Sequence, residues 1–427
     1  MGLPLLCVAF GGVLVFRHFR RTRQKQADLE FDLLDGIVRI TPSEVKILEV
    51  VGSGASAIVH KAIWKGTEIC VKLYRNDSLN VNVPMKTSSG QYLSSSEMHA
   101  FTNECRINTK LGSFPRVVPF LGGCYQPPNN IFVALVFMPH GSISDLLITN
   151  GQLPVHERVS LSDRCNNMRL LAQMLVDSSS AIVHVHSSQV LHRDIASRNF
   201  LVDLYHRVCV CDFGMSCSIP TGESTVVDKQ TLLAVKWSAP EVLQNGVYSF
   251  KSDVFSFAVF IFEVVAHEEP FSDIRSLQEV GNGIVRKQNP LRPKLPPECP
   301  RFLAVLMQEC WQIDPAQRPT MSEVNQRLTQ FSVALMQAGD DVNAALRIID
   351  PIGGGDSGSI VGFGPQVHAA GAGAASAVSK PVGSESRHYD WLGNYRIPSA
   401  NDRALSPLVQ RPSSAAVYGT QYALLSD

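Results

Sequence analysis

The 427-residue sequence has no excess of charge of either sign, because 38 Lys and Arg residues balance 38 Asp and Glu residues. This balance argues against a nucleic-acid binder with a strong basic bias, although it leaves room for a local basic patch. The ten cysteines include no CxxC pair and follow no disulfide or zinc pattern, so we expect reduced thiols. No internal repeat is evident. Hydrophobic residues make up 45% of the chain, which excludes a collagen-like or wholly disordered protein and allows a sizeable core.

The N-terminus has no basic residue ahead of its apolar run, which extends from Gly2 to Phe16, so it does not read as a secretory signal peptide. At about 1.5 Å per residue the run spans roughly 23 Å, short of the ~30 Å hydrocarbon core of a bilayer. Five basic residues follow within Arg17–Lys25. We therefore expect residues 1–25 to be a single membrane anchor with the rest of the chain in the cytoplasm. The alternative is a buried hydrophobic segment with a solvated basic flank.

Composition divides the rest of the chain into segments. Residues 26–45 read as a connector, residues 46–332 as a globular domain and residues 333–352 as its C-terminal extension. The Gly-, Ala- and Ser-rich stretch 353–386 predicts a flexible linker, and the polar stretch 387–427 predicts a disordered tail.

The globular segment begins with strand patterns and continues with helix patterns. Three β-branched runs, at 45–54, 57–66 and 67–74, are separated by Gly turns, and residues 94–111 predict a helix. The run 254–266 is apolar on every side and predicts a buried central helix. We infer an α+β fold with a small β-rich lobe and a larger helical lobe.

A Gly-rich turn, Gly52-Ser53-Gly54, lies between the first two predicted strands. Such a turn lets backbone N–H groups approach phosphates, although on its own the motif is better explained by a plain β-hairpin turn. The interpretation gains weight from Lys72, which lies eighteen residues after Gly54 in a predicted strand and can pair with phosphates from there.

The strongest signal is His192-Arg193-Asp194, with Asn199 five residues after the Asp and Asp212-Phe213-Gly214 a further thirteen residues on. One acid can accept the proton of a substrate hydroxyl, while the other acid and the amide hold Mg²⁺. Ala239-Pro240-Glu241 and Arg318 follow in order. Over residues 46–332 the chain resembles the eukaryotic protein kinases, and its finer motifs resemble the tyrosine kinase-like group.

This resemblance implies a bilobal kinase fold, the cofactors ATP and Mg²⁺, and protein substrates. It implies catalytic roles for Asp194, Lys72, Glu104 and Arg198, and metal ligation by Asn199 and Asp212. Leu135 would be the gatekeeper, followed by the hinge Val136–Met138. The implied nucleotide-binding residues are Gly52, Ser53, Gly54, Val59, Cys70, Lys72, Val136, Met138, Ser142, Asp145 and Leu201.

Three residues depart from the family pattern. Ala57 replaces the third Gly of the loop, and Cys70 replaces the Ala that touches adenine. Asn108 stands where the family packs an apolar residue on the Phe of the DFG motif, so we expect it to weaken the active state unless it finds a hydrogen-bond partner.

The motifs disagree about the hydroxyl that is phosphorylated. Ala196 stands where serine/threonine kinases carry Lys, and Arg198 follows as in tyrosine kinases, yet Ala234 matches neither class. No Tyr lies between Asp212 and Glu241. We favour tyrosine or dual specificity, keep serine/threonine specificity open, and regard a pseudokinase scaffold as the weaker rival. The tail tyrosines, predicted as autophosphorylation and docking sites for phosphotyrosine-binding partners, are Tyr389, Tyr395, Tyr418 and Tyr422.

Overall fold

The computed structural model describes residues 36–54, 57–74, 95–126, 130–149, 168–219, 225–226, 234–339 and 341–349. The predicted membrane anchor, the linker and the tail with its four tyrosines lie outside these residues. Among the residues that are described, no helix is both long enough and apolar enough to cross a membrane.

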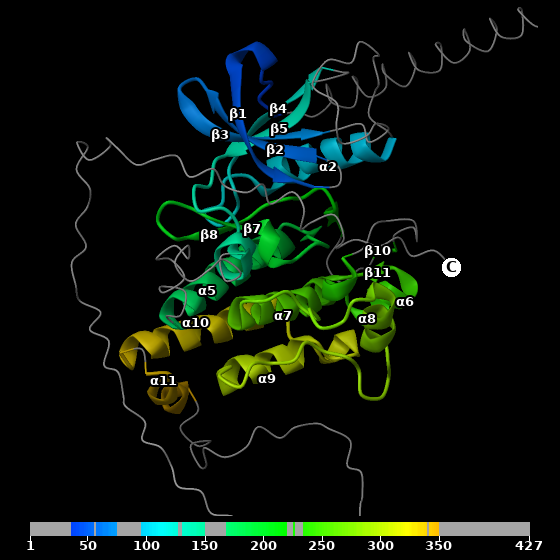
Figure 1. Ribbon diagram of the computed structural model, residues 1–427, viewed down its shortest axis with the longest axis vertical. Coiled ribbons are helices and arrows are strands. Elements are labelled where there is room, and N and C mark those ends of the chain that lie inside the picture. Colours follow the sequence, from blue (N-terminus) through cyan, green and yellow to red (C-terminus); the bar gives the residue numbers. More distant parts are fainter. Residues whose placement is uncertain are drawn as a thin grey trace, which may run out of the picture. The chain divides into compact units, whose positions relative to one another are not determined.

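The smaller lobe is built on a five-stranded antiparallel sheet with the strand order β1-β2-β3-β5-β4 (Figure 1). Its strands are β1 (Val45–Ser53), β2 (Ala57–Trp64), β3 (Thr67–Tyr74), β4 (Phe120–Gln126) and β5 (Asn130–Val136). Helix α2 (Ser95–Leu111) packs against β4 and β5. These elements confirm the three predicted strands and the predicted helix that follows them.

Strand β3 carries different side chains on the two faces of the sheet, because successive residues of a strand point to opposite sides. Ile69 and Val71 join an outer cluster that also includes Ile40, which is 2% exposed. The chain before β1 is therefore part of this lobe. Cys70 and Tyr74 belong to an inner cluster that includes residues of α2. The inner face of β3, on which Lys72 also lies, is the one that builds the site.

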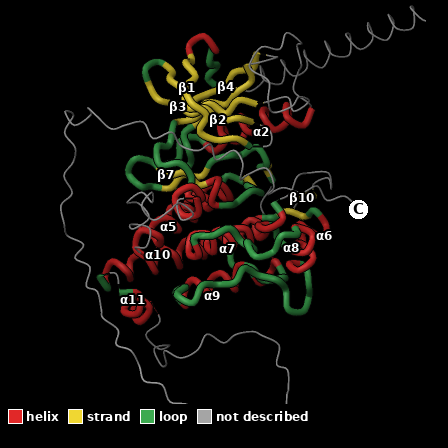
Figure 2. Tube along the Cα trace, in the orientation of Figure 1, coloured by secondary structure: helices red, strands yellow, loops and turns green. Residues whose placement is uncertain are grey.

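The larger lobe is mainly helical, as Figure 2 shows. Its helices are α5 (Met168–Ser187), α6 (Pro240–Asn245), α7 (Phe250–Ala266), α8 (Leu277–Ile284), α9 (Arg301–Cys310), α10 (Met321–Gln337) and α11 (Val342–Ile349). Short strands pair as β6 (Val190–Leu191) with β9 (Cys217–Ser218), β7 (Phe200–Val202) with β8 (Val208–Val210), and β10 (Thr225–Val226) with β11 (Val247–Tyr248). Short helical turns are η1 (Pro42–Glu44), η2 (Asp145–Thr149), η3 (Ser197–Asn199), η4 (Val235–Trp237) and η5 (Pro315–Gln317).

Helix α7 is the centre of this lobe. It contacts α5 and α9, and almost every residue from Ser252 to Val264 is buried, which confirms the predicted central helix. A capping box of Ser249 and Ser252 begins the helix. Two buried acids interrupt its apolar surface, Asp253 near the start and Glu263 near the end. A buried acid needs hydrogen-bond partners, so the groups bonded to these two acids are the ones that α7 holds in position.

Candidate active site

Strand β3, helix α2 and the DFG motif bring three charged side chains together. Lys72 Nζ lies 2.9 Å from Glu104 Oε2 and 2.7 Å from Asp212 Oδ1. The Glu104 side chain is only 1% exposed, whereas that of Asp212 is 41% exposed and accessible to a ligand. A Cβ at Gly214 would lie 3.3 Å from Asp212 Oδ1, which is tight for a side chain. The structure thus pairs the predicted Lys72 and Glu104 across 32 residues of sequence.

Lys72 and Asp212 each stabilise the charged form of the other. Burial lowers the pKa of Lys72, but the carboxylates of Asp212 and Glu104 outweigh it and hold that pKa well above its usual value. Burial also opposes ionisation of Asp212, yet Lys72 and the N–H of Gly214 outweigh it and lower the pKa of the carboxyl. Lys72 is therefore a cation and Asp212 an anion at neutral pH.

Tyr74 joins the same group, although the sequence analysis did not single it out. Its hydroxyl donates a hydrogen bond to Glu104 Oε2, the oxygen that also accepts from Lys72. The signal was present in the sequence, since Tyr74 lies two residues after Lys72 and alternate residues of a strand share a face.

Asp194 is held by two residues of the same loop. Arg198 Nη2 donates to Asp194 Oδ1 over 2.5 Å, and Asn199 Nδ2 donates to Oδ2 over 2.8 Å. Asn199 Nδ2 also donates to the backbone O of Asp194 over 2.7 Å. Because its amide nitrogen is committed to Asp194, the side-chain oxygen of Asn199 is the atom left to ligate a metal.

Asp253 of α7 fixes the backbone of the loop that carries Asp194. Its carboxylate accepts from the backbone N of His192 over 2.9 Å, the backbone N of Arg193 over 3.0 Å and His186 Nε2 over 3.0 Å. These bonds hold Arg193 at a φ of +67°, a conformation that non-glycine residues rarely adopt. Burial would raise the pKa of Asp253, but the hydrogen bonds and positive charge that His186 and His192 supply together outweigh it, so the pKa is lowered.

Glu263, the other buried acid of α7, supports Arg198 through a second residue. Its carboxyl accepts from Ser197 N over 2.9 Å, Ser197 Oγ over 2.7 Å and Trp237 Nε1 over 3.0 Å. The Arg198 guanidinium lies 4.6 Å from the centre of the Trp237 ring. Burial outweighs these donors and raises the pKa of Glu263 to about 7. Sequence reasoning took this stretch as uniformly apolar and missed the acid.

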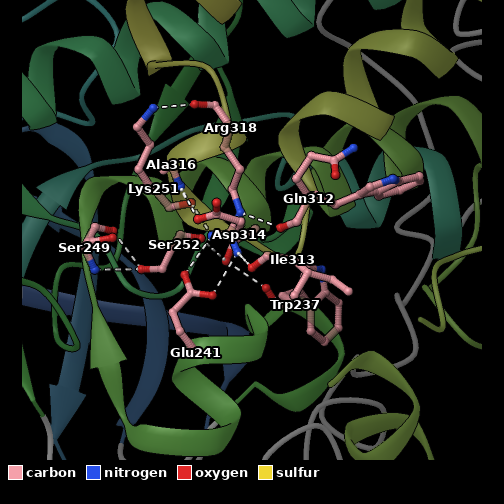
Figure 3. A network of polar contacts seen from close by, with 12 residues as sticks. Trp237, Glu241, Ser249, Lys251, Ser252, Gln312, Ile313, Asp314, Ala316 and Arg318 are labelled. Carbon is pink, nitrogen blue, oxygen red and sulfur yellow. Dashed lines mark hydrogen bonds and ion pairs between the residues drawn. The ribbon is translucent and has the colours of Figure 1, made fainter. Parts of the chain in front are cut away.

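Arg318 ties the APE motif to the base of the larger lobe, as Figure 3 shows. Its guanidinium makes a bidentate pair with Glu241, with distances of 2.7 and 2.8 Å. Three backbone oxygens complete the set, those of Gln312 at 2.8 Å, Lys251 at 2.8 Å and Ile313 at 3.2 Å. Since the Arg318 side chain is fully buried, every donor needs these acceptors.

Most of the residues expected around adenine come together, although Val59 is not part of their cluster. Cys70, Leu135, Met138 and Leu201 belong to the inner cluster of the smaller lobe. Cys70 pairs with Leu135 across β3 and β5. Burial raises the pKa of the Cys70 thiol to about 12, so this residue acts as a small apolar group at neutral pH. Val136 ends β5 directly beside this cluster.

The glycine turn and two further predicted nucleotide-binding residues are held by hydrogen bonds. Gly52 pairs with Val59 and Ser53 with Ile58, and Gly54 N donates to Ala57 O over 2.9 Å to close the turn. Ser142 Oγ donates to Asp145 Oδ2 over 2.7 Å, so these two predicted nucleotide-binding residues are bonded to each other.

The side-chain amide of Asn108 has a hydrogen-bond acceptor. Its Nδ2 bonds to the backbone O of Glu104 over 2.8 Å, inside α2, and the residue is 4% exposed. The hydrogen bond removes part of the expected cost of a polar side chain here.

The side chains gathered at this site fit Mg²⁺ and a nucleoside triphosphate. A carboxylate and an amide oxygen, from Asp212 and Asn199, are the hard oxygen ligands that Mg²⁺ prefers. The Lys72 ammonium and the backbone of the glycine turn supply positive groups for phosphates. An apolar cluster lies next to them for a base.

Known proteins that are similar in sequence to this chain are protein kinases. The family model for protein tyrosine and serine/threonine kinases matches residues 45–328. The chain is 29% identical to the dual specificity protein kinase pyk3 of Dictyostelium discoideum over 69% of this chain and 19% of that protein. It is 30% identical to the serine/threonine-protein kinase STY17 of Arabidopsis thaliana over 71% of this chain and 46% of that protein.

A third relative, the probable serine/threonine-protein kinase drkC of Dictyostelium discoideum, is 31% identical over 70% of this chain and 36% of that protein. The chain thus matches less than half of the length of each of these relatives. The shared region is the two-lobed domain that contains the site. The chain belongs to the protein tyrosine and serine/threonine kinase family.

Proposed function

We propose that this protein transfers the γ-phosphoryl group of ATP to protein hydroxyls, with tyrosine or dual specificity. The observation that carries the proposal is the joint placement of Lys72 on Glu104 and Asp212, with Asp194 held by Arg198 and Asn199. A pseudokinase scaffold does not need this complete set of charged groups.

Each residue has a defined task in the transfer. Asp194 orients the substrate hydroxyl and accepts its proton, and its two oxygens are fixed by Arg198 and Asn199. Lys72 binds the phosphates of ATP while Glu104 holds its ammonium in place. Asp212 and Asn199 are the residues that would hold Mg²⁺, which supplies neutralisation of the phosphate charge.

Two observations favour a phenolic acceptor. Ala196 leaves out the Lys typical of serine/threonine kinases, and Arg198 takes the tyrosine-kinase position against Trp237. Trp237 is in turn bonded to Glu263, so the Arg198 guanidinium has a rigid support beside Asp194. The relative pyk3 is named a dual specificity kinase. The alternative is serine/threonine specificity, as named for STY17.

Phosphoamino-acid analysis tests this proposal. The full chain is incubated with γ-labelled ATP, Mg²⁺ and a mixed peptide library, and Asp194→Asn serves as the control for contaminating kinases. We expect phosphotyrosine in the wild-type reaction and its selective loss in Arg198→Ala. Label on serine and threonine alone would establish the alternative, and no label would establish the scaffold.

We also propose that the N-terminal run anchors the protein in a membrane, with the kinase domain in the cytoplasm, for membrane-proximal signalling. The support is the apolar run Gly2–Phe16 and the basic cluster after it. Deletion of residues 1–25 should release the protein into the soluble fraction. A full-length chain that is already soluble at both low and high salt would contradict the anchor.

A further inference from the structure

Glu104 receives two donors on a single oxygen. Lys72 Nζ and the Tyr74 hydroxyl both bond to Oε2, while Oε1 is buried without a hydrogen-bond partner. The Glu104 carboxyl is therefore turned so that one oxygen takes all the contacts from β3. Tyr74 contributes half of them.

The tyrosine is itself rigidly placed. It is 6% exposed, and its ring meets that of Phe101 edge-on with centroids 5.4 Å apart. Lys72 Nζ lies 5.7 Å from the centre of the same ring. Phe101 belongs to α2, three residues before Glu104, so Tyr74 touches α2 at two points one turn apart.

Lys72 alone is not a dedicated partner for Glu104, because its ammonium is shared with Asp212 at 2.7 Å and is required for phosphate. A carboxylate as deeply buried as Glu104 needs compensation at all times. The hydroxyl of Tyr74 supplies a donor that has no second task among the contacts described.

We propose that Tyr74 is a positioning residue of the phosphoryl-transfer site, which holds the Glu104 carboxylate and with it α2 in register with Lys72. This inference rests on the proposed function, since Glu104 acts on the reaction only through Lys72. Tyr74 acts through Glu104, which in turn contacts Lys72. Its hydroxyl keeps Glu104 aligned while Lys72 binds the phosphates.

The test is Tyr74→Phe, which removes the hydroxyl and keeps the ring on Phe101. Tyr125→Phe is the matched control, because Tyr125 stacks on Phe101 at 6.0 Å and the change of side chain is the same. We expect kcat to fall about tenfold in Tyr74→Phe with the KM for peptide unchanged, since the lost bond is to a charged group. Because Tyr125→Phe leaves the bond between Tyr74 and Glu104 in place, it should lower kcat by less than Tyr74→Phe does.

A double-mutant cycle separates positioning from packing. In a Glu104→Ala background Tyr74→Phe should have no effect on kcat, whereas a packing role would give the same loss in both backgrounds. Urea unfolding of the same four proteins should also show coupling between the two substitutions, because both remove the hydrogen bond between Tyr74 and Glu104. Equal effects of Tyr74→Phe with and without Glu104, in rate or in unfolding, would overturn the inference.

The cycle also distinguishes this inference from the proposed function. A wild-type protein that transfers no phosphate contradicts the proposed function, while the unfolding cycle still reports on the bond between Tyr74 and Glu104. An active wild type with an equally active Tyr74→Phe contradicts the positioning role alone.

Discussion

Replacement of Arg318 by Lys should unfold this domain at a markedly lower temperature. Lys keeps the charge but loses the planar fork that pairs twice with Glu241 and reaches the oxygens of Gln312, Lys251 and Ile313. Breaking a buried ion pair costs about 3–5 kcal/mol, because the partner remains buried without compensation. We expect the free energy of unfolding to fall by about 3 kcal/mol, the lower end of this range, because Lys keeps a positive charge beside Glu241.

The assay is thermal unfolding by circular dichroism, with a loss of about 6–12 °C expected for a domain of this size. Arg327→Lys is the matched control. Arg327 pairs with Glu309 across α10 and α9, but both side chains are substantially exposed, at 30% and 43%. A pair of that kind contributes at most about 1 kcal/mol. Equal shifts in the two variants would refute the claim that burial, and not charge pairing alone, makes Arg318 important.

Three further predictions follow from the site and the tail. Glu263 has a pKa of about 7 when folded and an ordinary value when unfolded, so its contribution to stability is present at pH 4.5 and lost as the pH rises to 7. Glu263→Gln should therefore flatten the fall in the free energy of urea unfolding between pH 5 and pH 8, and an unchanged slope would contradict the burial argument. Lys110 Nζ lies 3.0 Å from the hydroxyl of exposed Ser218, so Ser218→Glu should pair with it, hold α2 and raise kcat about two- to fivefold. Persistence of that gain in Ser218→Glu combined with Lys110→Gln would rule out the ion pair. Mass spectrometry of the full chain after incubation with ATP should find phosphate on tail tyrosines, and phosphate confined to serine and threonine would contradict their role as docking sites; the sites to examine are Tyr389, Tyr395, Tyr418 and Tyr422.

The sequence was sufficient for the elements that have a clear period. β-Branched runs between Gly turns predicted β1, β2 and β3, and an apolar run predicted α7. The ordered motifs also led to the pairing of Lys72 with Glu104, because the resemblance supplied a partner that spacing alone could not.

Side chains that act through other residues were not predictable in the same way. Glu263 lies in an apolar run and bonds to Trp237, 26 residues away, so its role depends on packing that no local pattern records. Asp253 likewise fixes the backbone of His192 and Arg193 from 60 or more residues away. Tyr74 was within reach of the sequence through the period of β3, but its bond requires the position of α2, which follows only from the packed lobe.

The central claim is that Asp212, held by Lys72, is indispensable for phosphoryl transfer at this site. The most direct test is the kcat of Asp212→Asn with ATP, Mg²⁺ and a peptide substrate, measured beside the wild type, with thermal unfolding to show that the variant is folded. Loss of a metal ligand should lower kcat on the order of 10³-fold or more. A folded Asp212→Asn protein with wild-type turnover would contradict the account.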